Sequence, residues 1–331
     1  PNNNLFMHID DNDVQPILKG HFLLKMGNRS PLPQNGYEVY ADYAYQVQKQ
    51  TQREVLNLVS RKVDETGIKN VCLTGGYGFN VVANEHLVKN LPNVNFFFEP
   101  LADDSGNSIG AALQVYRLKT KDTKLRPLKD TFFNHVQHDI PDVGKKVSTK
   151  EIAELLDKGK IVAVYNGKAE AGPRSLGNRS ILFDARNPDA KKIINSVKHR
   201  EWYRPFAASV LKKRANEYFD MHGLKDSPFM TISFSVRKEK LNIIPGVVHK
   251  DDSCRIQTVD SSIRHYYKLL KEFDLLTGVP VLLNTSFNTA GNPLVETVEE
   301  AINMFEKTEI DVLWFPENKR MLMKTDKTKW H

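Results

Sequence analysis

The chain of 331 residues is 40% hydrophobic and 26% charged, a composition typical of a globular protein that excludes fibrous and disordered chains. Its net charge of +7 favours anionic partners, such as nucleotide phosphates or a nucleic-acid backbone. It contains no apolar run long enough to span a membrane, and its two cysteines form neither a disulfide framework nor a zinc motif, so we expect a cytoplasmic protein.

The first part of the chain alternates between helical and strand patterns of apolar residues, which predicts an α/β fold. The expected elements are a helix, a strand, a helix, a strand and the start of another helix, at residues 40–66, 70–74, 80–89, 94–98 and 109–112. Cys72 lies in the first of these strands, where we expect it to be buried as a small hydrophobic residue.

Two polar turns follow the two strands. Gly75 and Gly76 end the first strand, and glycines without a Cβ let a nucleotide approach the backbone closely, although many α/β crossovers contain such a pair. The turn lacks the P-loop and dinucleotide-binding patterns. The second turn, residues 103–106, is acidic, and Asp104 there suits a cation; the alternative is that Asp103 or Asp104 caps the next helix.

A segment rich in Lys, Asp and Pro, residues 117–147, has the character of a linker, and a new unit begins after it with a helix over 150–158 and a strand over 161–165. Residues 167–182 then place Arg174 and Arg179 among glycines. Guanidinium groups in such a loop suit phosphate or carboxylate recognition, and the alternative is that they brace the loop.

A cationic cluster comes next. Lys198, Arg200 and Arg204 lie within seven residues and precede an apolar strand, residues 207–211. Three cations in this position are costly to pack unless they face an anion or water, so the alternative to an anion site is an exposed helix end.

A third segment has polar residues at the mouth of an apolar strand. Residues 279–283 are apolar and run directly into Asn284, Ser286 and Asn288. Polar groups at the carboxyl end of a buried strand often bind ligands in α/β folds, and the alternative is an ordinary turn.

Together these segments resemble the ATP-dependent O-carbamoyltransferases of the nodulation-protein and antibiotic-tailoring type. The segment 172–182 is close to the family signature Gly-Pro-Arg-Ala-Leu-Gly-Asn-Arg-Ser-Ile-Leu. The similar segments follow the family's order and are residues 73–84, 100–112, 172–182, 197–211, 249–259 and 280–288.

The resemblance implies two α/β domains. Residues 1–115 would be the C-terminal half of an actin-like, threonylcarbamoyltransferase-like ATPase fold, residues 116–148 a linker, and residues 149–331 an adenylate-forming domain similar to threonylcarbamoyl-AMP synthase. The implied chemistry forms carbamoyl-adenylate from carbamoyl phosphate and ATP, and then transfers the carbamoyl group to an acceptor hydroxyl at a metal site. The acceptor stays open between a small molecule, such as a sugar or an aminoglycoside, and a nucleotide.

The resemblance also implies roles for residues. The catalytic set would be Lys198, Arg200, Arg204, Arg255, Asn284 and Ser286. The substrate- and nucleotide-binding set would be Gly75, Gly76, Asn80, Arg174, Arg179 and Asn288. Asp104 would bind a divalent metal (Fe, Mn or Mg) that is shared with the missing half of the actin-like domain.

The chain departs from the family pattern in two respects. It contains no His-x-x-x-His metal motif. The first half of the actin-like fold is missing as well, and an incomplete fold exposes a sheet edge and apolar surface. We therefore expect a second polypeptide to complete this domain. Two other functions compete with the transferase: a nucleic-acid-binding or tRNA-modifying module, suggested by the charge, and a non-catalytic assembly subunit.

Overall fold

The computed structural model describes residues 37–122, 124, 128–134 and 142–324. The chain divides into two compact units, residues 1–50 and residues 51–331, and the boundary falls within helix α3 (Tyr37–Thr66). None of the helices in the described part of the chain is long and apolar enough to cross a membrane.

The first elements of the second unit alternate between strands and helices, as predicted. Strands β1 (Asn70–Leu73) and β2 (Asn95–Phe98) pair in parallel, and between them lie the 3₁₀ turn η1 (Gly76–Phe79) and helix α4 (Val81–Asn90). Helix α5 (Ser105–Thr120) follows the acidic turn and extends four residues into the segment expected to be a linker.

The rest of the unit is built on a nine-stranded mixed sheet in the order β3-β11-β10-β4-β5-β9-β6-β8-β7. Its strands are β3 (Lys145–Lys146), β4 (Val162–Tyr165), β5 (Arg179–Asp184), β6 (Ala207–Leu211), β7 (Ser233–Ser235), β8 (Ser253–Val259), β9 (Val281–Ser286), β10 (Val312–Phe315) and β11 (Arg320–Met323). Its helices are α6 (Thr149–Asp157), α7 (Ala190–Val197), η2 (Lys212–Arg214), α8 (Ala215–Tyr218), η3 (Lys238–Lys240), α9 (Arg264–Thr277) and α10 (Val298–Lys307). The α/β prediction is confirmed.

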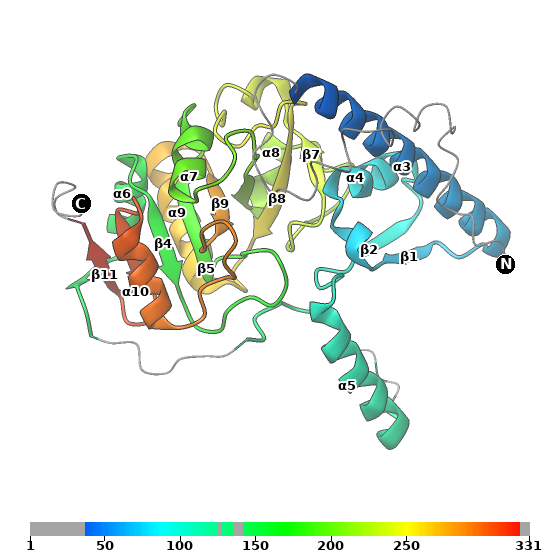
Figure 1. Cartoon of the computed structure of the whole chain (residues 1–331), viewed down its shortest axis with the longest axis horizontal. Coiled ribbons are helices and arrows are strands. Elements are labelled where there is room, and N and C mark those ends of the chain that lie inside the picture. The colour runs from blue at the N-terminus through cyan, green and yellow to red at the C-terminus, as the bar shows by residue number, and fades with distance from the viewer. Residues whose placement is uncertain (1–36, 123, 125–127, 135–141, 325–331) are drawn as a thin grey trace, which may run out of the picture. The chain divides into compact units, whose positions relative to one another are not determined.

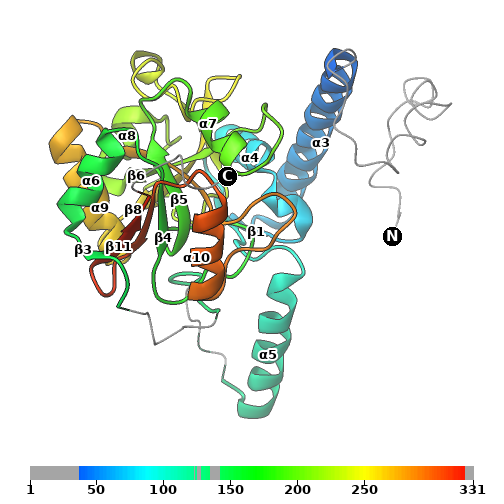
Figure 2. The same cartoon turned by 60° about the vertical axis from the view of Figure 1, so that its left-hand side comes forward.

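Helices cover both faces of this sheet (Figures 1 and 2). Alternate residues of strand β4 point to opposite faces: Val162 and Val164 pack with helices α6 and α9, whereas Ala163 and Tyr165 pack with α7 and α10. A strand buried on both faces must be apolar throughout, which is why β4 reads as an uninterrupted hydrophobic run.

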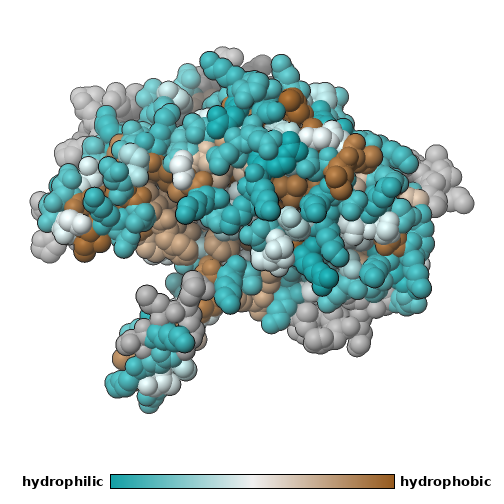
Figure 3. Space-filling model, turned by 180° about the vertical axis from the view of Figure 1, so that it is seen from behind, coloured by the Kyte–Doolittle hydropathy of each residue, from teal (hydrophilic) through white to brown (hydrophobic). Residues whose placement is uncertain are grey.

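The small β1–β2 sheet and helix α5 are far less covered. Helix α5 contains no buried residue, and Phe97, Leu113 and Leu118 expose 41%, 47% and 59% of their surface. Cys72 on β1 is also exposed, so the prediction that it is buried is wrong. Hydrophobic residues reach the surface on α5 and around its start (Figure 3). This part of the described structure therefore carries an exposed apolar surface.

Candidate active site

The ammonium group of Lys198 joins two of the segments singled out by the sequence. Lys198 caps the C-terminus of α7 and is 1% exposed. Its Nζ donates to the backbone oxygen of Asn288 at 2.7 Å, to Asn288 Oδ1 at 2.8 Å and to Ser286 Oγ at 3.3 Å. The amide of Ala290 donates to the backbone oxygen of Lys198 at 2.9 Å. The cationic cluster and the polar strand mouth therefore meet in one place.

The hydrogen bonds around Lys198 orient the end of strand β9. Ser286 Oγ donates to Asn288 Oδ1 at 2.6 Å, and Asn288 Nδ2 donates to the backbone oxygen of Asn292 at 2.6 Å. The oxygens around the ammonium belong to carbonyl and hydroxyl groups, so no carboxylate among the described residues pairs with Lys198. Burial, and then the charge of Arg200, lower the pKa of Lys198 to about 7.

Three guanidinium groups add to this positive charge. Burial, followed by the charges of Arg174 and Arg200, lowers the pKa of Arg255 to about 9. The Nε atoms of Arg174, Arg200 and Arg255 are buried, and within the described part of the chain they have no hydrogen-bond partner. No ion pair to a carboxylate is found for any of the three among the described residues. Buried cations without counter-charges are unfavourable, and a bound anion would relieve that cost.

Arg204 lies at the rim of this cluster of partly buried cations. Its side chain is exposed, and its Nε forms an ion pair with Glu201 Oε2 at 2.6 Å. A surface pair of this kind is weak, and the charge of Arg204 still contributes, after burial, to lowering the pKa of Arg200. The assignment of Arg204 to the catalytic set stays a prediction.

Arg179 is a brace, which is the alternative left open by the sequence. It is fully buried, and its five N–H donors reach the backbone oxygens of residues 166, 167, 178, 295 and 296 at 2.8–3.3 Å. Its guanidinium also stacks on the ring of Tyr165, 3.6 Å from the centroid. No donor remains for a phosphate, so the assignment of Arg179 to phosphate binding is corrected.

Asn284 also has an internal role. It is 0% exposed, and its Nδ2 donates to the backbone oxygen of Ser175 at 3.2 Å and to Ser209 Oγ at 3.0 Å. The first contact ties strand β9 to the loop that precedes β5, and the second ties it to strand β6. The Oδ1 atom of Asn284 has no hydrogen-bond partner in the described structure, and the assignment of Asn284 to the catalytic set stays a prediction.

The predicted nucleotide turn differs in detail from expectation. Gly75 adopts φ +83°, and a Cβ on Gly75 or Gly76 would contact no other atom, so the backbone there is open to a ligand. The side chain of Asn80 instead accepts from the amide of Ala83 at 3.1 Å and caps helix α4. Its assignment to nucleotide binding stays a prediction beside this structural role.

The acidic turn holds one capping and one exposed carboxylate. Asp103 Oδ1 accepts from the amide of Ser105 at 3.1 Å, so Asp103 takes the capping role. Asp104 is exposed and makes no side-chain capping bond. Among the described residues, no group of three or more His, Cys, Asp and Glu side chains is arranged to hold a metal ion. These residues therefore do not form a metal site by themselves.

The loop that carries Arg174 touches both polar turns of the β1–β2 part. The Arg174 guanidinium lies 5.7 Å from the ring centroid of Phe79, just beyond Gly75 and Gly76. Gly172, at φ +84°, packs so closely on residues 100 and 101 that a Cβ would lie 2.8 Å from Leu101 Cδ2. The loop thus connects the cationic cluster with the glycine and acidic turns.

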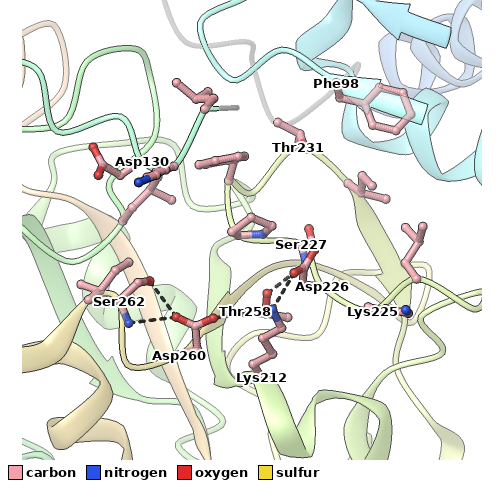
Figure 4. Close-up of a pocket in the computed structure, with 18 of the residues that line it drawn as sticks. Phe98, Asp130, Lys212, Lys225, Asp226, Ser227, Thr231, Thr258, Asp260 and Ser262 are labelled. Carbon is pink, nitrogen blue, oxygen red and sulfur yellow. Dashed lines mark hydrogen bonds and ion pairs between the residues drawn. The ribbon is translucent and has the colours of Figure 1, made fainter. Parts of the chain in front are cut away.

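A separate cavity of about 450 Å³ lies beside strand β2 and beyond the ends of β6 and β8 (Figure 4). Lys212 Nζ is 2.6 Å from Asp226 Oδ2 and 3.5 Å from Asp260 Oδ2. This cation is already neutralised, in contrast to the guanidinium groups around Arg255. The cavity therefore does not have the character of an anion site.

Two residues that support the site were not predicted from the sequence. Asn195 is buried on α7, and its Nδ2 donates to the backbone oxygens of Trp202 at 3.2 Å and Arg204 at 3.0 Å, which shapes the loop after Lys198. His249 Nε2 donates to the backbone oxygen of Phe206 at 2.9 Å. An asparagine on the apolar face of a helix was the available signal for Asn195, and for His249 the signal was its place at the start of the family-like segment 249–259.

Comparison with family models gives matches over most of the chain. The model described as Carbamoyltransferase C-terminus matches residues 153–321, and the model described as Carbamoyltransferase N-terminus matches residues 15–113. The C-terminal match alone covers about half of the chain and contains Lys198, Arg255 and Ser286.

Individual relatives give the same result. An uncharacterized protein from Synechocystis is 34% identical over 86% of this chain and 52% of its own length. Nodulation protein NolNO from Sinorhizobium fredii is 33% identical over 83% of this chain and 43% of its own length. Nodulation protein U from Azorhizobium caulinodans is 32% identical over 84% of this chain and 50% of its own length. The chain thus spans about half the length of the curated relatives it matches.

Solved structures show weaker likeness. Full-length HypF, in its phosphate- and nucleotide-bound form, is 20% identical over 52% of this chain and 24% of its own, with a TM-score of 0.37. A variant of Sua5 from P. abyssi is 13% identical over 53% and 55%, with a TM-score of 0.35. At these scores neither structure carries an argument about this chain.

Proposed function

The chain belongs to the carbamoyltransferase family, and on that premise we propose that residues 149–331 form carbamoyl-adenylate from carbamoyl phosphate and ATP. For the atoms to balance, water converts carbamoyl phosphate into carbamate and inorganic phosphate. A carbamate oxygen then bonds to the α-phosphorus of ATP, and the bond from that phosphorus to pyrophosphate breaks. The pocket must therefore hold two highly charged anions close together.

One observation supports this proposal above all: the group formed by Lys198, Arg174, Arg200 and Arg255 is positively charged, partly or fully buried, and without an ion pair to a carboxylate in the described structure. These cationic side chains are therefore held near one another before an anion binds. Because these groups are partly or fully removed from water, each cation stabilises developing negative charge more strongly than it would in bulk solvent.

The residues divide between charge and orientation. Arg255, Arg200 and Arg174 suit the phosphate oxygens, since each guanidinium can donate two parallel hydrogen bonds. Lys198 lies against the polar strand mouth, where Ser286 and Asn288 suit the carbamoyl amide and the α-phosphate. An anion bound beside Lys198 raises the pKa of its ammonium group, so binding near neutral pH is accompanied by proton uptake.

The second step transfers the carbamoyl group from the adenylate to an acceptor hydroxyl. We propose that the open backbone at Gly75 and Gly76 approaches the nucleotide of the adenylate in this step. Asp104 is proposed as one ligand of a divalent cation (Fe, Mn or Mg), whose other ligands lie outside the described residues. A bound cation of this kind would polarise the carbamoyl oxygen. The anhydride-forming pocket around Lys198 does not depend on it.

We further propose that a second polypeptide completes the β1–β2 part and covers the exposed face of helix α5. Phe97, Leu113 and Leu118 are exposed on elements within the N-terminal family match or at its edge. Purification of the chain as a stable monomer with full transfer activity toward a hydroxyl acceptor would contradict this part of the proposal.

Single-turnover measurement with ATP and carbamoyl phosphate tests the adenylation step. With enzyme in excess over ATP, we expect one pyrophosphate and one inorganic phosphate for each ATP consumed. Acetyl phosphate in place of carbamoyl phosphate should give no pyrophosphate. Release of the γ-phosphate of ATP as inorganic phosphate, with no pyrophosphate, would instead indicate a simple ATPase.

A further inference from the structure

The backbone of residues 175–179, within the signature segment, is held by side chains from several different elements. Asn284 on β9 donates to the oxygen of Ser175, Gln257 on β8 donates to the oxygen of Leu176 at 2.8 Å, and His265 on α9 bonds the oxygen of Gly177 at 2.9 Å. In surface loops, backbone oxygens seldom accept hydrogen bonds from so many side chains of neighbouring elements. The conformation of this segment is therefore over-determined.

Glu170 supplies the remaining anchors. Its Oε1 accepts from the amides of Leu176 at 2.6 Å, Asn178 at 2.9 Å and Arg179 at 3.4 Å. The side chain is 2% exposed, and its Oε2 has no hydrogen-bond partner within the described structure. One carboxyl oxygen thus accepts hydrogen bonds from three backbone amides of one tight turn. This arrangement requires the burial of a carboxyl group.

The turn leaves little freedom to the residues that precede it. Gly177 adopts φ +120°, and a Cβ there would lie 2.6 Å from Tyr266 Cδ1, so the segment cannot shift toward α9. On its other side Gly172 packs on residues 100 and 101. Arg174 lies between these two fixed points, close enough for its charge to lower the pKa of Arg255.

We infer that Glu170 is a positioning residue for the anion pocket: by collecting the amides of residues 176, 178 and 179 on one oxygen, it holds Arg174 beside Arg255. Glu170 does not touch the ligand itself. The inference rests on the proposed function only in taking the ligand to be a phosphate-bearing anion.

The chemistry of the carboxyl group makes the inference testable by two substitutions. Burial raises the pKa of Glu170, and the hydrogen bonds from Leu176 and Asn178 act in the opposite direction. In Glu170→Gln, the amide oxygen can still accept from the same three N–H groups. In Glu170→Ala no acceptor remains, and three buried amides lose their partner. Glu170→Gln should therefore retain the anion affinity that Glu170→Ala loses.

Calorimetric binding of inorganic pyrophosphate to the full chain provides the readout, because it needs no turnover. We expect Glu170→Ala and Arg174→Ala each to weaken binding by about tenfold, as loss of one charged contact does, and Glu170→Gln to weaken it by no more than about threefold. If Glu170 acts through Arg174, the double variant should bind about as weakly as Arg174→Ala alone. Glu239→Gln, an exposed control, should bind as the unmodified chain does.

Hydrogen exchange gives a second readout, should Glu170→Ala lower the yield of folded protein. The amides of Leu176 and Asn178 should exchange faster in Glu170→Ala, while those of strand β9 remain protected. The inference would be overturned if the losses of pyrophosphate affinity in Glu170→Ala and Arg174→Ala multiplied in the double variant. It would also be overturned if a folded Glu170→Ala bound pyrophosphate with unchanged affinity. Pyrophosphate binding with the expected pattern but without carbamoyl-dependent chemistry would refute the proposed function alone, whereas absence of pyrophosphate binding would refute both.

Discussion

Lys198 and Asn288 lie 90 residues apart in the sequence, and the Nζ atom of Lys198 donates to both the backbone oxygen and the Oδ1 atom of Asn288. This contact places the end of helix α7 against the end of strand β9. It also places the ammonium group near the guanidinium of Arg200, whose charge adds to the effect of burial in lowering the pKa of Lys198. The predictions below depend on that arrangement.

The titration of Lys198 should be visible in the pH dependence of stability. Its pKa is lowered from 10.5 to about 7 in the folded protein, so between these values the unfolded chain binds more protons than the folded one. The free energy of unfolding should therefore rise with pH across this window, by at most about 1.4 kcal/mol per pH unit. Below pH 7 the folded protein bears the full cost of burying the protonated ammonium group.

Urea unfolding at several pH values across this window measures the effect. In Lys198→Met the rise should flatten, because the group that titrates is gone. Lys192→Met, on the exposed face of the same helix, should keep the slope of the unmodified chain. An unchanged slope in Lys198→Met would show that Lys198 does not titrate in the window.

Removal of one buried charge should separate stability from ligand binding. Arg255→Met deletes a guanidinium that is repelled by Arg174 and Arg200, so the free energy of unfolding without ligand should stay equal or rise. Pyrophosphate affinity should fall about tenfold or more. The control is Arg264→Met, at an exposed position on α9. A variant that loses stability and keeps its affinity would contradict the assignment.

The two arginines of the signature segment should behave in opposite ways. Arg179→Ala removes five hydrogen bonds to backbone oxygens and should cost on the order of 3–5 kcal/mol in the free energy of unfolding. Arg174→Ala should change stability by less than about 1 kcal/mol while weakening pyrophosphate binding. Denaturant titration combined with calorimetry distinguishes them, and a reversed pattern would exchange their roles.

The two cysteines should differ in reactivity. Cys72 is exposed, whereas burial raises the pKa of Cys254 to about 12. Burial, and then the charge of Glu99, also raise the pKa of Cys72, so its alkylation should accelerate as the pH rises above neutrality. Mass spectrometry after iodoacetamide treatment of the folded chain should find the label on Cys72 alone. Labelling of Cys254 before unfolding would contradict the packing of strand β8.

The sequence could predict the elements because their patterns are local. The apolar runs that become β4, β6 and β9, and the polar groups that follow β9, are each visible in a short window. The family resemblance implied that Lys198 and Asn288 belong to one site, and the two residues are in contact in the structure.

The rest depends on contacts that a local pattern does not encode. Arg174 and Arg179 sit in equivalent glycine-rich surroundings, and only the pairing of Arg179 with Tyr165 across β5 and β4 turns its side chain into the core. Cys72 lies in an apolar strand, but its burial depends on a covering layer that the described residues do not supply. Glu170 carried no signal, because three backbone amides converge on it only after folding.

The exchange of labelled pyrophosphate into ATP tests the central claim most directly. The account predicts exchange that requires carbamoyl phosphate, is lost in Lys198→Ala and is retained in Lys192→Ala. Exchange that proceeds without carbamoyl phosphate, or that survives loss of Lys198, would contradict the claim that the pocket at Lys198, Ser286 and Asn288 forms the carbamoyl-adenylate anhydride.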